Sequence, residues 1–312
     1  MTLPARLSGV LCPVVTPFKT DLSPDPDRLI RQSQWLLSQG VGLAVFGTTS
    51  EGNSLSVDEK IALLDRLAEA GIDLSRMMAG TGCCALSDTV RLTRHAVEVG
   101  CAGVLMLPPF YYKAVGDDGL FDSYAGVIDR VASDRLRIYL YHIPPVAQVG
   151  LSIDLVERLV RRYPDTVVGI KDSSGDWDNT LALLRRRWDD FRVFAGSEGF
   201  LLRTLQHGGA GCISATANVN GAAIRRLFLN WRDPQAVAEQ EQLDALRRLF
   251  QAYPMIPALK AVIAAHTADG EWQTVRPPLA VLRTEQKRSL LASLDERAFA
   301  MPGLPGRHCI NP

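Results

Sequence analysis

The sequence predicts a closed (β/α)₈ barrel followed by a C-terminal helical extension. From about residue 10 to residue 232, eight short apolar runs alternate with longer segments of helical periodicity, which is typical of βα units and a parallel sheet. Eight units fit a closed barrel better than an open doubly wound sheet, and no Gly-x-Gly-x-x-Gly follows the first run. After residue 232 the alternation stops, and only helical segments follow.

Each predicted element comes from one of these segments. The predicted strands are the apolar runs 10–15, 43–46, 77–80, 103–107, 137–141, 167–170, 192–195 and 211–214. The helices between them are predicted over 27–39, 57–70, 87–99, 118–131, 152–162, 178–188, 198–206 and 222–231. Several open with Ser or Asp in capping position, and Gly40, Gly71 and Gly100 each follow a helical run.

The chain is expected to divide into three parts. These are the barrel over 1–232, a helical extension over 233–300 and an irregular tail over 301–312 that contains three prolines and two glycines. Helices are predicted over 234–252, 256–267 and 278–294 within the extension, with prolines as breakers between them.

Composition argues against several classes of protein. The 34 basic and 34 acidic residues cancel, so no basic field is available to bind nucleic acid. No apolar run reaches the ~18 residues of a membrane span, and the apolar run near the N-terminus is too short for a signal sequence. The cysteines contain no Cys-x-x-Cys pair and the histidines no paired spacing. We therefore expect a cytoplasmic protein with reduced thiols, no metal site, no nucleic-acid partner and no membrane contact.

Three strand ends carry polar groups that deserve a functional interpretation, because residues after the strands of such a barrel line its reaction face. Lys171 follows the run 167–170, although alone it would indicate only a solvated strand end. The turn 47–52, Gly-Thr-Thr-Ser-Glu-Gly, suits a carboxylate or, equally, a loop that caps the next helix. Tyr141 ends the fifth strand, where a phenol either plugs the barrel mouth or relays protons.

Together these groups indicate a particular chemistry. An amine surrounded by apolar walls loses its proton more readily, and a neutral amine attacks ketones. The resulting iminium withdraws electrons from the adjacent carbon, so that a C–C bond breaks or forms through an enamine. The sequence predicts this Schiff-base chemistry at Lys171, without a cofactor.

Motifs in the same order resemble the dihydrodipicolinate synthase / N-acetylneuraminate lyase family of pyruvate-dependent class I aldolases. They are residues 47–51, 141–144 and 169–176, and the resemblance extends over nearly the whole chain. It implies that Lys171 forms a Schiff base with pyruvate, that the second substrate is a small aldehyde, and that the protein is a homotetramer built as a dimer of dimers.

The resemblance also implies roles for other residues. Tyr141 would shuttle protons, and Thr48 and Thr49 would bind the pyruvate carboxylate, with Thr49 also linked to the tyrosine. Tyr112 would contribute to the site of a neighbouring subunit. The remaining residues expected to line the substrate pocket are Gly47, Gly196, Ile213, Glu198 and Val146.

Two departures from the family pattern bear on the substrate. Synthases of the family carry an arginine for the carboxylate of aspartate semialdehyde where this chain has Val146, and valine forms no charge-assisted pair. Sialic-acid lyases offer acidic and hydroxyl groups where this chain has Glu198 followed by Gly199. The resemblance is thus to a member of unassigned substrate that uses a shorter or less polar aldehyde. A 4-hydroxy-tetrahydrodipicolinate synthase, a 2-keto-3-deoxy sugar acid dehydratase or aldolase, and a non-catalytic oxo-acid-binding protein are the alternatives.

Overall fold

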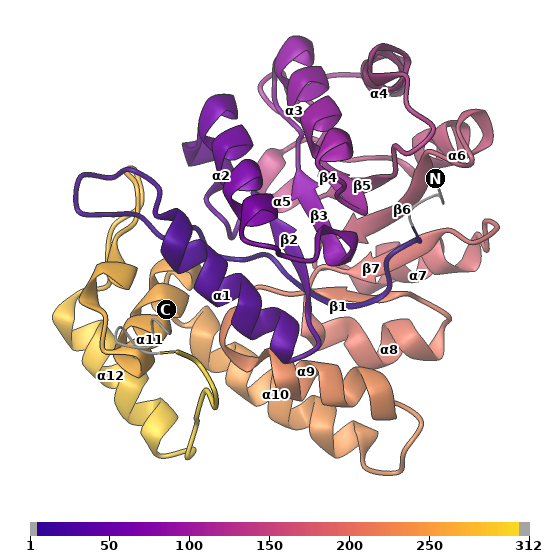
Figure 1. The fold of residues 1–312 in the computed structure, drawn as a ribbon. Helices are drawn as coiled ribbons and strands as arrows, with labels where there is room; N and C mark the ends of the chain where they lie inside the picture. The colour runs from indigo at the N-terminus through magenta and orange to yellow at the C-terminus, as the bar shows by residue number, and fades with distance from the viewer. Residues whose placement is uncertain (1–4, 306–312) are drawn as a thin grey trace.

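The structure is a computed structural model that describes residues 5–305. Eight parallel strands close into a barrel in sequence order, with β8 paired to β1 (Figure 1). The strands are β1 (Gly9–Cys12), β2 (Gly42–Val45), β3 (Met77–Gly80), β4 (Gly103–Met106), β5 (Ile138–His142), β6 (Val167–Asp172), β7 (Arg192–Ala195) and β8 (Gly211–Ile213). This arrangement confirms the predicted (β/α)₈ barrel.

Helices surround the strands. Those of the barrel are α1 (Pro26–Ser38), α2 (Val57–Glu69), α3 (Leu86–Glu98), α4 (Asp117–Val131), α5 (Pro144–Ala147), α6 (Ile153–Arg162), α7 (Trp177–Arg185), α8 (Leu201–Gln206) and α9 (Ala217–Asn230). The extension consists of α10 (Ala236–Gln251), α11 (Met255–Thr267) and α12 (Thr284–Asp295). Short 3₁₀ helices are η1 (Gly52–Ser54), η2 (Leu74–Arg76), η3 (Glu198–Phe200) and η4 (Gly270–Gln273). Between residues 5 and 305, no helix is both long and apolar enough to cross a membrane.

The largest boundary errors lie late in the chain. The helix predicted over 278–294 begins only at Thr284, because the Leu279 N–H closes a turn onto the Arg276 carbonyl and Arg283 is extended. The helix predicted over 222–231 begins earlier, at Ala217. Of the predicted tail, residues 306–312 lie outside the described residues. The division of the chain at residue 232 stays a prediction.

Apolar side chains form two layers, as expected where a parallel sheet is buried on both faces. The layer inside the barrel includes Leu11, Met78, Leu105, Tyr139 and Phe194. The layer between strands and helices is larger and continuous with the core of the C-terminal extension. The described barrel interior is therefore a packed core, and the reaction face of this fold lies at the carboxyl ends of the strands.

A register shift in the ladder between β5 and β6 determines which side chains face the barrel interior. The shift lies between Ile138 and Tyr139, and beyond it Tyr139 pairs with Gly169 and Tyr141 pairs with Lys171. Tyr139 and Tyr141 belong to the inner layer, so Lys171 faces inward beside Tyr141. Irregularities of this kind redirect side chains next to functional sites.

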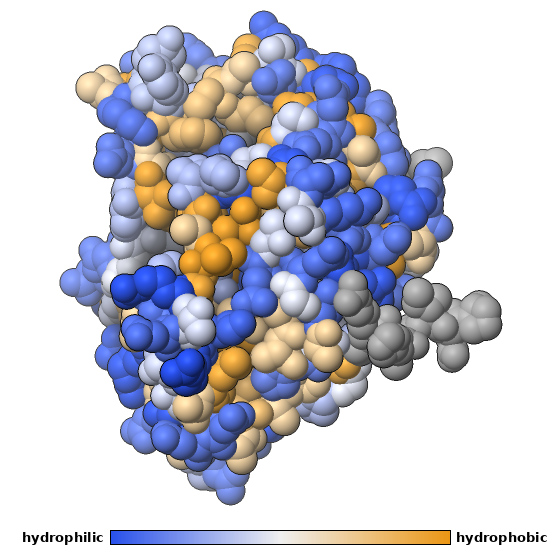
Figure 2. Space-filling view, turned by 90° about the vertical axis from the view of Figure 1, so that its left-hand side faces the viewer, coloured by the Kyte–Doolittle hydropathy of each residue, from blue (hydrophilic) through white to orange (hydrophobic). Residues whose placement is uncertain are grey.

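The C-terminal helices α11 and α12 lie on the same side of the molecule as α1 and α2 (Figure 1). Figure 2 views the molecule from that side, and apolar residues gather across the middle of this face with hydrophilic residues around them. Apolar surface bordered by polar residues is typical of sites that contact a ligand or another chain.

Candidate active site

Lys171 lies near the carboxyl end of β6 with only 4% of its surface exposed. Its Nζ donates a hydrogen bond to Tyr141 Oη at 3.2 Å and lies 4.3 Å from the centroid of the Tyr141 ring. The same phenol oxygen is 3.2 Å from Thr48 Oγ1. The three side chains thus form a continuous hydrogen-bonded chain from the amine to the turn after β2, and such a chain is able to carry protons.

The turn after β2 presents two free backbone donors. Within residues 5–305, the N–H groups of Thr48 and Thr49 donate no hydrogen bond, and both residues line the pocket that contains Lys171. The turn is closed by bonds from Glu51 N to Thr48 O at 3.1 Å and from Gly52 N to Gly47 O at 3.0 Å. Adjacent free N–H groups and hydroxyls are suited to bind a carboxylate.

The C-terminal extension holds this turn in place. Glu51 adopts a left-handed backbone conformation with φ 54°, and its buried carboxylate pairs with Lys260 of α11 and accepts the Arg276 N–H at 3.0 Å. Burial lowers the pKa of the Lys260 ammonium to about 8, while the Glu51 carboxylate opposes this shift. On the other side, Thr16 Oγ1 donates to Ser50 O at 2.6 Å. The turn is therefore fixed from both sides before any ligand binds.

These groups open into a cavity of about 580 Å³ at the carboxyl ends of the strands. Gly196, Ile213 and Val146, all predicted at the sequence level, also line it. Gly196 has no room for a side chain, because a Cβ there would lie 2.6 Å from the Asp172 carbonyl oxygen. Val146 is 61% exposed, and its side chain offers no polar atom.

Two expectations about the turn after β2 need correction. Thr48 makes the bond to Tyr141 that we assigned to Thr49, because successive residues of the turn direct their side chains differently. Gly47 closes the turn but does not line the cavity. Tyr112 is 73% exposed between β4 and α4 and does not line the cavity of its own subunit, so its role at the site of a neighbouring subunit stays a prediction.

Glu198 does not reach the cavity as a substrate ligand. Its side chain is 1% exposed and accepts hydrogen bonds from Ser214 and Thr216. It also pairs with Arg247 Nη1 at 2.9 Å. The short helix η3 turns this carboxylate inward, so that it anchors an arginine of the extension.

The structure adds a group of residues that the sequence analysis missed. One face of α10 lines the cavity with Asp244, Arg247, Arg248 and Gln251. Their spacing of three, one and three residues places them together on a helix. A polar stripe with this period is visible in the sequence, but such a stripe ordinarily faces solvent. Only the packing of α10 across the barrel mouth shows otherwise.

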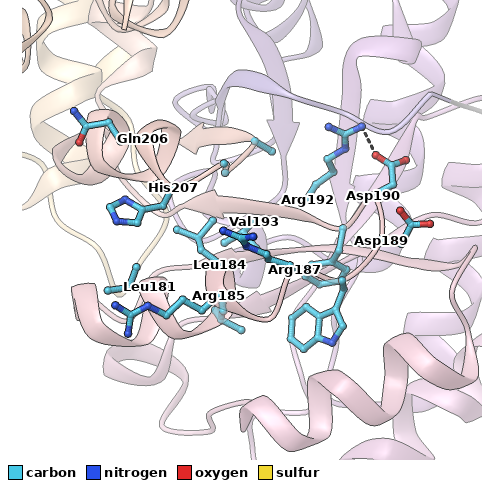
Figure 3. Close-up of a pocket in the computed structure, with 16 residues that line it drawn as sticks. Leu181, Leu184, Arg185, Arg187, Asp189, Asp190, Arg192, Val193, Gln206 and His207 are labelled. Carbon is cyan, nitrogen blue, oxygen red and sulfur yellow. Dashed lines mark hydrogen bonds and ion pairs between the residues drawn. The ribbon is translucent and has the colours of Figure 1, made fainter. Parts of the chain in front are cut away.

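A larger hollow, about 670 Å³, lies at the opposite ends of the strands. It is lined near the start of β7 by Arg192 and near the start of β8 by Ala210. Figure 3 shows Arg185, Arg187 and His207 around it, with Asp190 bonded to Arg192. None of the predicted site residues lines this hollow. Reaction sites in this fold lie at the carboxyl ends of the strands, so we assign the chemistry to the cavity around Lys171.

Thiols lie close to the site. Burial raises the pKa of the Cys12 and Cys212 thiols well above their usual range, while the Lys171 amine acts in the opposite direction on both. The five cysteines of the described residues are free, and Cys309 lies outside them. No group of three or more His, Cys, Asp or Glu side chains between residues 5 and 305 is arranged to hold a metal ion.

Relatives in other organisms match this chain over almost its whole length. A "DapA-like lyase" of Chloroflexus aurantiacus, itself uncharacterized, is 34% identical over 294 residues, covering 93% of this chain and 97% of the relative. The 4-hydroxy-tetrahydrodipicolinate synthase of Moorella thermoacetica is 30% identical, covering 92% of this chain and 97% of the relative.

Solved structures of other proteins superimpose on almost the whole of this chain. The dihydrodipicolinate synthase from Agrobacterium tumefaciens superimposes with a TM-score of 0.84 at 34% identity, over 92% of this chain and 98% of that one. YagE from Escherichia coli K12, solved in complex with pyruvate, gives 0.86 at 25% identity, over 95% of this chain and 100% of that one. The model of the dihydrodipicolinate synthetase family matches residues 6–297. The chain therefore belongs to the dihydrodipicolinate synthetase family and is an enzyme of the lyase class.

Proposed function

We propose that this enzyme forms a Schiff base between Lys171 and pyruvate, and thereby cleaves or condenses a 2-oxo acid with release or uptake of a small aldehyde. The observation that carries the proposal is the continuous line from the buried Lys171 Nζ through Tyr141 Oη to the partly buried Thr48 Oγ1, with both contacts at 3.2 Å. Amine, proton relay and carboxylate-binding turn lie together at one mouth of the barrel.

The covalent step follows from these positions. The neutral Lys171 amine attacks the ketone carbon of the 2-oxo acid, and its nitrogen lone pair forms the new C–N bond. The ketone oxygen takes up protons through Tyr141 and leaves as water, which gives the iminium. The free N–H groups and hydroxyls of Thr48 and Thr49 hold the neighbouring carboxylate and so orient the ketone.

Bond cleavage uses the same relay in the opposite direction. Tyr141 accepts the proton of the hydroxyl on the carbon that becomes the aldehyde. The C–C bond electrons move toward the iminium nitrogen, so an aldehyde and an enamine result. The enamine carbon takes up a proton, and water hydrolyses the iminium to release pyruvate and regenerate the Lys171 amine.

The comparisons support the pyruvate end of the proposal more than the other end. YagE was solved with pyruvate bound, whereas the named relatives include both a lyase of unassigned substrate and synthases. Val146 lines the cavity without a polar atom, which argues against an aspartate semialdehyde carboxylate bound at that position.

Reduction with borohydride in the presence of pyruvate tests the proposal. It should trap a three-carbon adduct on Lys171, detected by peptide mass spectrometry, and leave the peptides of buried Lys60 and exposed Lys113 unmodified. The Lys171→Ala variant is the control for labelling elsewhere. Absence of an adduct on Lys171 contradicts the mechanism and leaves a non-catalytic oxo-acid-binding protein as the alternative.

A substrate panel separates the remaining enzymatic alternatives. Pyruvate release from 4-hydroxy-2-oxo acids indicates an aldolase, whereas loss of water from 2-keto-3-deoxy sugar acids indicates a dehydratase. Condensation of pyruvate with aspartate semialdehyde is the control for synthase activity. We expect aldehyde release to dominate and the synthase reaction to be weak.

We also propose that the enzyme is a cytoplasmic homotetramer, a dimer of dimers in which Tyr112 of one subunit completes the site of another. Tyr111 and Tyr112 are each 73% exposed, and their rings meet edge to face at 5.4 Å. Exposed aromatic pairs are common in protein interfaces.

Complementation tests the role of Tyr112. Tyr112→Phe and Lys171→Ala homomers should both be weakly active. Tetramers co-assembled from the two variants should regain activity, because some sites then hold both native residues. The Tyr111→Phe variant is the matched control. Mixed tetramers that are no more active than the average of the parents contradict a role across the interface.

A further inference from the structure

We propose that Arg247 and Arg248 of α10 form a subsite for a terminal oxyanion, a carboxylate or a phosphate, at the outer end of the cavity. The substrate would then carry an acidic group at the end remote from its 2-oxo acid. The inference rests on the proposed function in one respect, namely that the 2-oxo acid end lies at Lys171. A cavity of about 580 Å³ exceeds what a three-carbon acid occupies.

Arg247 is held with one edge of its guanidinium unused. Its Nη1 bonds to Glu198 at 2.9 Å and to Ser214 at 3.4 Å. Within the described chain, Nε and Nη2 make no hydrogen bond. These two nitrogens form the edge of the fork that binds carboxylate or phosphate with two parallel hydrogen bonds. The buried Glu198 thus fixes Arg247 and leaves its binding edge available.

Arg248 supplies a charge without a partner. It is exposed and lines the cavity beside Arg247. No ion pair or hydrogen bond joins its side chain to any residue between 5 and 305. Its unbalanced charge lies at the rim, where an incoming anion meets it first.

No carboxylate of the described residues bonds to the free edge of Arg247 or to Arg248. Glu198 lies beneath Arg247 and is already bonded to two hydroxyls. Asp244 lines the cavity as well, and it accepts a hydrogen bond from Gln240 Nε2 at 2.8 Å. Among the cavity-lining side chains of the described residues, the basic ones are Lys171, Arg247 and Arg248. Beyond Lys171, the two arginines are therefore the basic side chains of the described cavity lining that are available to an anion.

Gly199 keeps the space beside the arginine open. A Cβ at this position would lie 3.8 Å from Arg247 Cδ and 3.7 Å from Asp244 Oδ1. A longer side chain at residue 199 would extend into the cavity that Gly199 lines. A Gly199→Leu variant therefore blocks the subsite without removing a charge.

Calorimetric titration with matched pairs of 2-oxo acids tests the inference. Each pair has one chain length and differs only at its end, as 2-oxoglutarate differs from 2-oxopentanoate, and pairs of five, six and seven carbons cover the reach of the site. Analogues with a terminal phosphonate distinguish phosphate from carboxylate. The proteins are the wild type, Arg248→Gln and the matched control Arg288→Gln, which removes an exposed arginine of α12 outside the cavity.

The wild type should bind the oxyanion-terminated acid of at least one length about 10- to 100-fold more tightly than its methyl-terminated partner. Arg248→Gln and Gly199→Leu should reduce this ratio about tenfold or more, and Arg288→Gln should not. Arg247→Gln alone would leave the buried Glu198 carboxylate without its positively charged partner. That arginine is therefore tested in the double variant Glu198→Gln/Arg247→Gln. A ratio near one at every length, or a ratio unaffected by both Arg248→Gln and this double variant, overturns the subsite.

The same titrations on Lys171→Ala separate this inference from the proposed function. That variant forms no Schiff base, so any remaining preference for the oxyanion arises from the outer end alone. Dependence on Arg248 without borohydride trapping in the wild type would uphold the subsite and refute the Schiff base. Borohydride trapping of pyruvate on Lys171, without a preference for the oxyanion-terminated acid, would uphold the Schiff base and refute the subsite.

Discussion

The inner and outer ends of the cavity are built in different ways. At the inner end, Lys171 and Tyr141 lie on neighbouring strands in a fixed register, and the side chains are nearly buried. At the outer end, Arg247 and Arg248 lie on a helix of the extension, and Val146 lies on a short helix after β5. The inner end is thus part of the barrel, whereas the outer end is added on top of it.

This difference separates the chemistry from the choice of substrate. Groups that hold a reacting atom need rigid elements and supporting bonds, which the strands and the Glu51–Lys260 pair provide. Groups on added helices change without disturbing the barrel, so they are suited to selecting among substrates. Changes at the inner end should therefore affect every substrate alike, and changes at the outer end should affect substrates selectively.

Removal of the Lys171 amine should have the largest effect. Lys171→Ala is expected to lower turnover by about 10⁴-fold or more for every substrate, because no other group forms the covalent intermediate. Steady-state pyruvate release measures it, and the exposed Lys19→Ala serves as control. Substantial residual turnover with some substrates would break the distinction between the two ends.

Disruption of the buried ion pair between Glu51 and Lys260 should have the second-largest effect, on stability. Lys260→Met leaves the Glu51 carboxylate buried without its partner, and the free energy of unfolding should fall by about 3–5 kcal/mol. Lys60→Met is the matched control, because burial lowers the pKa of Lys60 and no carboxylate pairs with it among residues 5–305. Urea unfolding should show little loss, or a gain, for that control. Equal losses in the two variants would contradict a specific role for the pair.

The two threonines of the turn should differ in their effect on the relay. Thr48→Val removes the hydroxyl that bonds to Tyr141 and should lower kcat by about 10- to 100-fold. Thr49→Val keeps that bond and should mainly raise KM for pyruvate. Steady-state kinetics with pyruvate as the varied substrate separates the two effects. A loss of kcat in Thr49→Val with an increased KM in Thr48→Val would instead support the hydrogen bond between Thr49 and Tyr141 that the sequence led us to expect.

The smallest effect concerns His142, which faces away from the cavity. Burial lowers its pKa below the ordinary 6.5, with Asp172 opposing, and its Nδ1 accepts the Leu151 N–H at 2.9 Å. In the unfolded chain the imidazole takes up a proton at higher pH than in the folded state. The wild type should therefore lose stability as the pH falls below about 6.5.

The matching variant is His142→Asn, in which this part of the pH dependence should be absent. Urea unfolding at pH 7.5 and pH 5.5 measures the difference between the variant and the wild type. His207→Asn controls for the loss of a histidine as such. If the free energy of unfolding changes equally with pH in the wild type and in His142→Asn, the buried imidazole is not the source of the pH dependence.

Much of the inner end could be predicted from the sequence, because strand ends converge in a closed barrel. Lys171, Tyr141 and the Thr48–Thr49 turn each follow an apolar run, and the fold brings such positions to one mouth. Glu198 was misplaced because its position at the start of a helical segment does not reveal that it points inward. The arginines of α10 were missed because periodicity cannot tell a polar stripe that faces solvent from one that faces a cavity.

By itself, the sequence determined the eight βα units, the order of the strands and the chemical identity of the groups at their ends. These features depend on local periodicity and on residue type, both of which can be read directly from the amino-acid sequence. The tertiary structure alone decided that the register shift turns Lys171 toward Tyr141, that Thr48 completes the relay, and that Glu198 holds Arg247. Each of these joins segments far apart in sequence, and their contact depends on packing that no local pattern encodes.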